Sequence, residues 1–189
     1  IRQVDGGFVG KSGLWVMPCG VGKTLTAAAL CKIIGRHCIW VVPNAETAMQ
    51  SKDAFAQLGC LDVVIVGVDA VRGARLMDNS HDRPAIVIVT WKTLANHIRS
   101  SVDSADFIML CAIECASYAY VILDETHMFP ARTHLCAALS IRSDAVLGMT
   151  ASLSRADGRQ SEITSEIGDM LYEMSLAGAE AQNLLSHVT

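Results

Sequence analysis

The chain lacks the sequence features of several common protein classes. Its formal net charge is −4 over 189 residues, so a general positive surface for gripping nucleic acid is excluded, and any such contact must be local. Its seven cysteines include no C-x2-C pair, and an odd number argues against both a disulfide framework and a zinc site. The six histidines show no ligand spacing. These cysteines fit a reducing, intracellular compartment.

Long apolar runs without charge are also lacking. The longest candidate, residues 105–123, contains Asp106 and Glu114, so we do not expect a membrane span. No internal repeat, low-complexity tract or signal peptide is visible, and the start at Ile1 indicates an excised or processed segment. The 51% of hydrophobic and 18% of charged residues are typical of a folded globular chain. We expect one domain over residues 1–189, with a substantial core.

The first motif with chemical content is LWVMPCGVGKT, at residues 14–24. An apolar run breaks at Pro18 and enters a glycine-rich turn that ends in Gly-Lys-Thr. The strict phosphate-loop pattern is Gly-x4-Gly-Lys-Ser/Thr, and it fails at one position because Met17 stands where the first glycine is expected. The candidate nucleotide-binding residues are Pro18, Cys19, Gly20, Val21, Gly22, Lys23 and Thr24.

Each part of this loop has a physical reason to hold a nucleotide. Gly20 and Gly22 allow positive φ and a close approach of backbone to phosphate. Lys23 would pair with the β- and γ-phosphates, the Thr24 hydroxyl would bind Mg²⁺, and the following helix would point its N-terminus at the anion. The alternative is a plain glycine turn in which Lys23 is a solvated residue of the first helical turn.

The second motif is VILDETH, at residues 121–127. Its apolar start predicts a buried strand, and two carboxylates follow at the carboxyl end, where open α/β sheets bind ligands. Asp124 would hold Mg²⁺ through water, and Glu125 would orient and deprotonate the attacking water. An Asp-Glu pair by itself is more often a solvated strand exit. The phosphate loop upstream favours the nucleotide interpretation.

Strand and helix patterns alternate along the chain, which predicts an α/β fold with a mostly parallel sheet covered by helices on both faces. The strand patterns lie at about 13–18, 38–42, 62–66, 85–90, 119–124 and 144–149. The helical patterns lie at 23–34, 45–58, 91–99, 105–116 and 129–139. We expect a loop over 72–84 and one or two short helices in the tail 158–189.

Hydroxyl and amide side chains follow three further strands at the same expected edge of the sheet. Asn44 and Thr90 each stand at a strand end just before a helical pattern, and Thr150 and Ser152 follow the strand that ends near 149. Routine helix capping explains each residue taken alone. The occurrence of all these residues in this order along the chain favours a functional role over routine capping.

In this order, MPCGVGKT, VVPN, VTWKTL, LDETH and GMTAS resemble the first RecA-like motor lobe of superfamily 2 helicases. The loop at 18–24 is similar to the PCGAGK form of XPB-type helicases. The segments ILDETHMFPA, at 122–131, and LGMTASLSRAD, at 147–157, are similar to the corresponding segments of that group. The likeness covers roughly residues 13–173 by motif order.

The resemblance implies a RecA-like P-loop NTPase domain and an ATP-dependent DNA helicase or translocase of the repair and transcription-initiation type. It implies ATP and Mg²⁺ as cofactors, with Glu125, Asp124 and Lys23 as catalytic residues and Thr24 and Asp124 at the metal. Residues that couple hydrolysis to the second lobe would be His127, Thr150 and Ser152. Candidate DNA-binding residues are Asn44, Thr90, Trp91, Lys92 and Arg155.

The expected partners are DNA, a second RecA-like lobe that lies outside this chain, and other subunits of a repair or transcription complex, with no membrane. The location would be nuclear in a eukaryote and cytoplasmic otherwise. Two departures from the family pattern stand out: Arg155-Ala156-Asp157 lacks the usual central glutamate, and Thr126 replaces a valine at a site that should face the core. A non-catalytic scaffold and the first lobe of a DExH-box RNA helicase remain alternatives.

Overall fold

The computed structural model describes residues 2–4, 7–9, 11–59, 62–66, 85–99, 118–128, 132–152 and 160–184. Its strands are β1 (Arg2–Val4), β2 (Gly7–Val9), β3 (Gly13–Val16), β4 (Cys38–Val42), β5 (Asp62–Ile65), β6 (Ala85–Thr90), β7 (Tyr118–Leu123), β8 (Ser143–Thr150) and β9 (Met170–Glu173). Its helices are α1 (Lys23–Ile34), α2 (Ala45–Gln57), α4 (Trp91–Arg99), the short 3-10 helix η1 (Thr126–Met128), α6 (Arg132–Leu139), α7 (Gln160–Ile167) and α8 (Leu176–Ala181).

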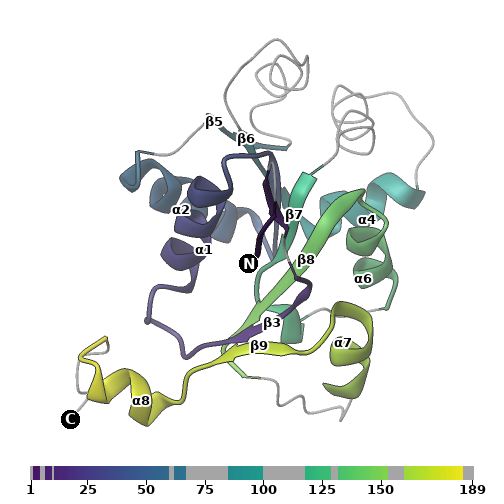
Figure 1. Ribbon diagram of the computed structural model, residues 1–189. Helices are drawn as coiled ribbons and strands as arrows, with labels where there is room; N and C mark the ends of the chain where they lie inside the picture. Colours follow the sequence, from purple (N-terminus) through teal and green to yellow (C-terminus); the bar gives the residue numbers. More distant parts are fainter. Residues whose placement is uncertain are drawn as a thin grey trace.

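A parallel sheet organises the described chain. Its strand order is β5-β6-β4-β7-β8-β3-β9, and each neighbouring pair is parallel. Figure 1 shows α1 and α2 on one face of this sheet and α4, α6 and α7 on the other. Strands β1 and β2 form a separate antiparallel pair. The predicted fold class, a parallel sheet with helices on both faces, is confirmed.

The central strands are buried because both of their faces are covered. All five residues of β4 are inaccessible, and they alternate between two apolar layers. Ile39 and Val41 belong to the layer beneath α4, α6 and α7, whereas Cys38, Trp40 and Val42 belong to the layer beneath α1 and α2. Because the apolar run of β4 is continuous, the sequence alone predicted the position of this strand.

The six predicted strands and most predicted helices are confirmed, with 38–42 and 85–90 matching β4 and β6 at both ends. The predicted helix at 105–116 and loop at 72–84 lie outside the described residues. One or two short helices were expected in the tail, and its described residues contain α7 and α8, but β9 between them was not expected. All four residues of β9 are exposed at the sheet edge, so burial of one face imposes no alternation of apolar and polar residues that would mark it as a strand.

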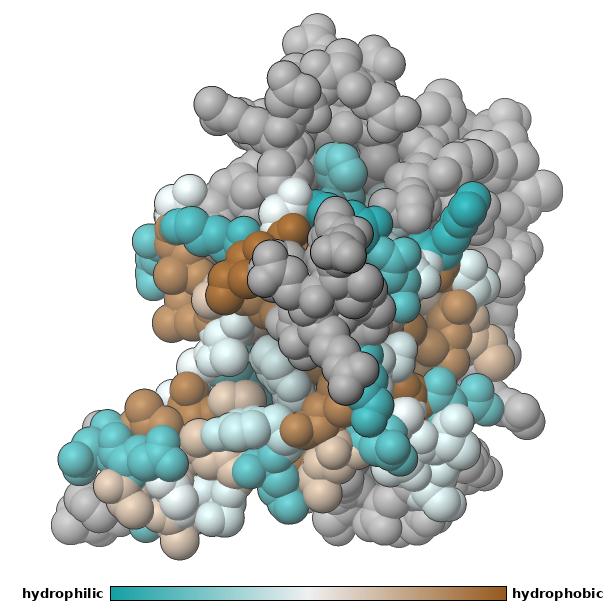
Figure 2. Space-filling view, in the orientation of Figure 1, coloured by the Kyte–Doolittle hydropathy of each residue, from teal (hydrophilic) through white to brown (hydrophobic). Residues whose placement is uncertain are grey.

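Apolar side chains reach the surface over the helices that flank the sheet (Figure 2). On α1 and α2 the exposed large hydrophobic residues include Leu25, Ile33 and Met49. Further exposed apolar residues occur on β9 and α8, namely Met170, Leu171, Tyr172 and Leu176. Within the described residues, no helix is both long and apolar enough to cross a membrane.

Candidate functional site

The phosphate-loop motif forms the turn between β3 and α1. Gly20 and Gly22 have φ angles of 84° and 86°, a left-handed region that favours glycine. A Cβ at Gly22 would meet nothing within 4 Å, so backbone conformation, and not space, requires glycine there. The loop is tied to the sheet because Met17 N donates to Thr150 O at 2.9 Å.

The start of α1 is suited to an anion. Gly22 occupies the N-cap position, and no side chain caps the first turn. The first backbone N–H groups of a helix have no partner within the helix, and the helix dipole favours negative charge at this end. Thr24, half-buried, is the second residue of α1. Pro18 is half-buried and Cys19 is exposed in the loop before it.

Lys23 joins the phosphate loop to the acidic motif. Its Nζ donates to Met17 O at 3.3 Å and lies 3.3 Å from Glu125 Oε1. The lysine is only 8% exposed, so an unpaired charge there would be costly. Two residues about a hundred positions apart thus meet in an ion pair across the sheet edge.

Asp124 and Glu125 follow directly after β7. Asp124 is 4% exposed, and one of its oxygens, Oδ1, accepts a hydrogen bond from Glu125 N at 3.0 Å. Burial raises the pKa of Asp124 from 3.8 to about 6, and the negative charge of Glu125 adds to the rise. The favourable interactions of the ionised Asp124 carboxylate do not offset the cost of its burial, and a bound cation would supply a further one.

Glu125 adopts an uncommon backbone conformation. Its φ is 49°, in the left-handed region, where a non-glycine residue costs of order 1–3 kcal/mol. The turn is held on both sides, because Met128 N donates to Glu125 O at 2.8 Å and Asp124 N donates to Val41 O at 2.9 Å. The Glu125 Oε2 atom is buried, lies 3.3 Å from His127 Nδ1 and receives no hydrogen bond.

His127 connects the acidic turn to the end of β8. Its Nδ1 lies 2.7 Å from Thr150 Oγ1. Thr150 Oγ1 donates its proton to Ser152 O at 2.6 Å, so it must accept a proton from His127 Nδ1. This arrangement places the ring proton on Nδ1. The three residues predicted to couple hydrolysis to a second lobe therefore form one hydrogen-bonded chain.

Thr126 has a larger structural role than the sequence suggested. The prediction that it faces the core is confirmed, because it is fully buried. Its hydroxyl lies 3.0 Å from both Leu123 O and Met149 O, and thus joins the end of β7 to the end of β8. Sequence reasoning missed this bridge, since neither carbonyl oxygen is visible in a motif.

The candidate DNA residues divide into two groups. Asn44 caps α2 by accepting from Thr47 N at 2.9 Å, and Thr90 Oγ1 accepts from Thr93 N at 3.2 Å in the first turn of α4. They end neighbouring strands at the same sheet edge, where Val42 lies opposite Thr90.

The remaining candidate DNA residues differ in their accessibility. Lys92 is exposed, whereas Trp91 is 6% exposed and packs in the core. The Trp91 ring therefore supports the fold, which corrects the prediction of a DNA-binding side chain at this position. Arg155 lies outside the described residues.

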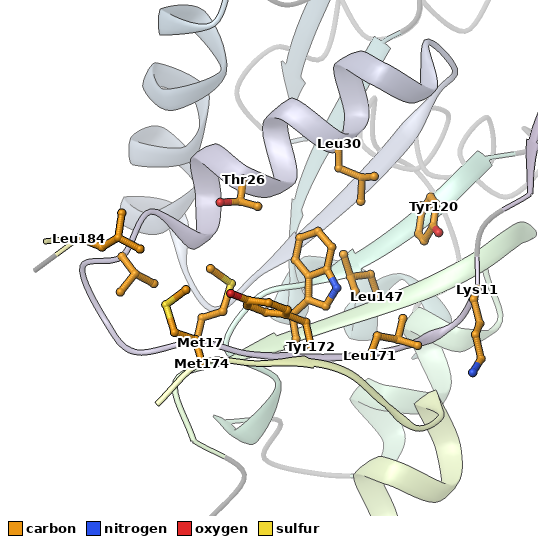
Figure 3. Close-up of a pocket in the computed structure, with 12 residues that line it drawn as sticks. Lys11, Met17, Thr26, Leu30, Tyr120, Leu147, Leu171, Tyr172, Met174 and Leu184 are labelled. Atoms are coloured by element: carbon orange, nitrogen blue, oxygen red, sulfur yellow. The ribbon is translucent and has the colours of Figure 1, made fainter. Parts of the chain in front are cut away.

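An apolar pocket lies beside the phosphate loop, on the α1 side of the sheet (Figure 3). Its volume is about 600 Å³. Met17 and Val21 line it from the loop, and Thr26 and Leu30 line it from α1. The carboxylates of the candidate site are not among the pocket's lining residues.

Comparison with known proteins places this geometry among helicase domains. The family model described as "Type III restriction enzyme, res subunit" matches residues 8–155. The chain is 28% identical over 173 residues to the general transcription and DNA repair factor IIH helicase/translocase subunit XPB of Schizosaccharomyces pombe. It is 30% identical over 182 residues to the DNA 3'-5' helicase XPB of Mycobacterium tuberculosis.

These matches cover 92% and 96% of the chain but only 21% and 31% of the respective relatives. Among solved structures, the helicase domain of Pyrococcus furiosus Hef matches with a TM-score of 0.70 at 17% identity, covering 95% of this chain and 39% of that one. The UvsW helicase of bacteriophage T4 matches with a TM-score of 0.60 at 17% identity, covering 88% and 56%. These structures share the RecA-like helicase fold with the chain.

Proposed function

The chain belongs to the family described as type III restriction enzyme, res subunit, and from that premise we propose that it is the ATP-binding first motor lobe of an ATP-dependent DNA helicase or translocase of the XPB type. The observation that carries the proposal is the contact between Lys23 and Glu125 at 3.3 Å. It joins the phosphate loop to the acidic motif at the carboxyl edge of a parallel sheet, where such sheets bind ligands.

The residues of this edge fit Mg·ATP. The uncapped N-terminus of α1 and the left-handed glycines before it leave backbone N–H groups for the phosphates. Lys23 would bind the β- and γ-phosphates, and the Thr24 hydroxyl and the Asp124 carboxylate would hold the ion. Magnesium usually takes one or two protein ligands together with phosphates and waters, and when bound it neutralises charge that develops on the phosphates.

Glu125 would act as the base that orients and deprotonates the attacking water. Its Oε2 receives no hydrogen bond and is therefore available as an acceptor. Lys23 lies against the other carboxylate oxygen, and a bound phosphate would compete with Glu125 for its ammonium group. Nucleotide binding would thus free the base at the moment it is needed.

The hydrogen-bonded chain from His127 through Thr150 to Ser152 would report the state of Glu125 to a second lobe. His127 Nδ1 lies near Glu125 Oε2 as well as Thr150 Oγ1. A change in the charge around Glu125 would therefore alter the partner of the ring proton. In the intact protein, Ser152 would pass this change toward the second lobe.

The test uses a protein that contains both motor lobes and the variant Glu125→Gln. We expect ATP hydrolysis to fall about 10²-fold or more, because general-base catalysis contributes on the order of 10²–10⁴. Binding of a fluorescent ATP analogue with Mg²⁺ should persist or tighten, since Lys23 no longer has a carboxylate partner. Glu173→Gln is the control, because Glu173 is an exposed carboxylate on β9. Unchanged hydrolysis in Glu125→Gln would refute the assignment.

We further propose that DNA tracks along the edge formed by the N-termini of α2 and α4. Caps at Asn44 and Thr90 leave other backbone N–H groups of these first turns facing the same side, and Lys92 adds an exposed positive charge. Such contacts recognise phosphate and not base. Binding should therefore be indifferent to sequence and show a shallow dependence on salt, given the net charge of −4.

Lys92→Ala should lower DNA-stimulated hydrolysis while leaving nucleotide binding unchanged. Lys32→Ala is a suitable control, because Lys32 is an exposed lysine in the last turn of α1, where it donates to Leu58 O. Equal stimulation in Lys92→Ala and wild type would move the DNA path off this edge.

We further propose a nuclear location for the protein if its source is a eukaryote, and a cytoplasmic location otherwise.

A further inference from the structure

The side chain of Thr126 closes the turn that carries both carboxylates of the candidate site. Its Oγ1 lies 3.0 Å from Leu123 O, three residues earlier, so the contact spans Asp124 and Glu125. The turn needs such support, because the φ of Glu125, 49°, is uncommon for a non-glycine residue. Thr126 is fully buried, so solvent does not compete for its hydroxyl. The helicases that the chain resembles have a valine here, which cannot donate a hydrogen bond.

The same hydroxyl also reaches β8, the neighbour of β7 in the sheet (Figure 1). Thr126 Oγ1 lies 3.0 Å from Met149 O, near the carboxyl end of β8. A hydroxyl has one proton, so the carbonyl oxygens of Leu123 and Met149 share or exchange it. The packing leaves little freedom, because a Cβ at Gly148 would lie 3.0 Å from Thr126 Oγ1. One atom thus holds the acidic turn against β8.

The next residue of each segment forms a second link. His127 Nδ1 lies 2.7 Å from Thr150 Oγ1. Thr126 and His127 are consecutive, and so are their partners on β8, Met149 and Thr150. The two links therefore run side by side, one to a backbone carbonyl and the other to a side-chain hydroxyl. Because two consecutive residues are held, loss of either link leaves the strand end fixed by the other.

The end of β8 also holds the phosphate loop. Met17 N donates to Thr150 O at 2.9 Å, and Met17 O accepts from Lys23 Nζ at 3.3 Å. Lys23 Nζ in turn lies 3.3 Å from Glu125 Oε1. A displacement of the β8 end relative to the acidic turn would therefore shift the lysine relative to the carboxylate. Misplacement of a catalytic group by about 1 Å can cost on the order of 10²-fold in rate.

We propose that Thr126 is a positioning residue for ATP hydrolysis, which holds the acidic turn against β8 in parallel with His127. The proposal rests on the function proposed above, in which Glu125 is the base. Thr126 acts through its neighbours, by keeping Glu125 and the phosphate loop in register. Its hydroxyl is the group required, because both contacts are made to carbonyl oxygens.

The test is a double-variant cycle in a protein that contains both motor lobes. Steady-state ATP hydrolysis is compared among wild type, Thr126→Val, His127→Ala and the double variant, at a temperature where circular dichroism shows each to be folded. Thr126→Val alone should lower kcat by at most about threefold, because His127 still holds β8, whereas in the His127→Ala background it should lower kcat about tenfold or more. The KM for ATP should not change, since Lys23 and Thr24 are untouched.

Thr126→Ser separates the hydroxyl from the bulk of the side chain. In the His127→Ala background this change should leave kcat unaltered, although removal of a buried methyl group lowers stability. Ile86→Val is the control for lost stability, because Ile86 is fully buried and lies at the other end of the sheet, opposite Cys38. The proposal is overturned if Thr126→Val lowers kcat by the same factor in both backgrounds, or if Thr126→Ser lowers it as much as Thr126→Val.

Amide hydrogen exchange tests the link without nucleotide. The Met17 N–H reports local opening at the end of β8, where its acceptor lies. The Ala119 N–H donates to His37 O at the other end of β7 and is the internal control. Thr126→Val should accelerate exchange at Met17 roughly 2- to 10-fold more than at Ala119, the factor expected for one hydrogen bond, and Thr126→Ser should not.

Equal acceleration at both amides in Thr126→Val would also overturn the proposal, because the link would then support only the sheet as a whole. Failure of the proposed function gives a different result. Wild type and Glu125→Gln would then hydrolyse ATP alike, whereas the exchange at Met17 would still decide whether Thr126 holds the end of β8.

Discussion

The bridge made by Thr126 gives a quantitative test of how the catalytic turn is held. Thr126→Val keeps the shape of the side chain and removes the hydroxyl that lies 3.0 Å from Leu123 O and from Met149 O. A buried hydrogen bond contributes about 0.5–1.5 kcal/mol net. The new methyl group would also crowd two carbonyl oxygens at a site with no solvent access. We expect a total loss of about 1–2 kcal/mol in the free energy of unfolding.

For a domain of this size, 1 kcal/mol corresponds to roughly 2–4 °C in melting temperature, so Thr126→Val should melt roughly 2–8 °C lower. Urea unfolding at constant m-value is the direct assay. Thr164→Val is the matched control, because its hydroxyl bonds Ser161 O at the exposed surface of α7 and should matter by less than about 0.5 kcal/mol. Equal stability of Thr126→Val and wild type would show that the bridge contributes nothing.

The other predictions concern the same strand ends. Asp124→Asn should stabilise the nucleotide-free protein in EDTA, because the folded-state pKa of about 6 lies above the ordinary 3.8. Wild-type stability should therefore fall as pH rises through 4 to 6, and the advantage of Asn should grow over that range to at most about 3 kcal/mol. Urea titrations at pH 4 and pH 8 measure it, and an equal difference at both would contradict the argument. Gly148→Ala should lower stability by about 1–3 kcal/mol, because its Cβ would lie 2.5 Å from Leu14 Cδ2 and 3.0 Å from Thr126 Oγ1; a melting curve unchanged from wild type would show that the strand ends yield without cost.

The central strands and the loop were predictable because their signals are local. A continuous apolar run such as 38–42 can be stable only where both faces are covered. Gly20 and Gly22 mark a backbone that only glycine adopts readily. Asn44 was predicted as a cap because its side chain reaches a backbone N–H three residues away. None of these inferences required knowledge of a distant residue.

The edge strand β9 could not be predicted for the opposite reason. Its four residues are exposed, so burial imposed no alternation on them, and its pairing partner β3 lies more than 150 residues earlier in the sequence. The pairing of Trp15 with Tyr172 is a property of the assembled sheet. Strand formation there depends on a template that exists only after the rest of the sheet is in place.

The sequence by itself determined which side chains carry the chemistry: the lysine and hydroxyl of the phosphate loop and the two carboxylates after β7. Only the tertiary structure decided how they meet. The order β7-β8-β3 brings Lys23 to Glu125 and places Thr150 between their strands, within reach of His127. Ion pairs and hydrogen bonds act over a few ångströms, and distances along the chain do not specify distances in space. A sequence motif can therefore identify the functional side chains, whereas the order of the strands determines which of them are in contact.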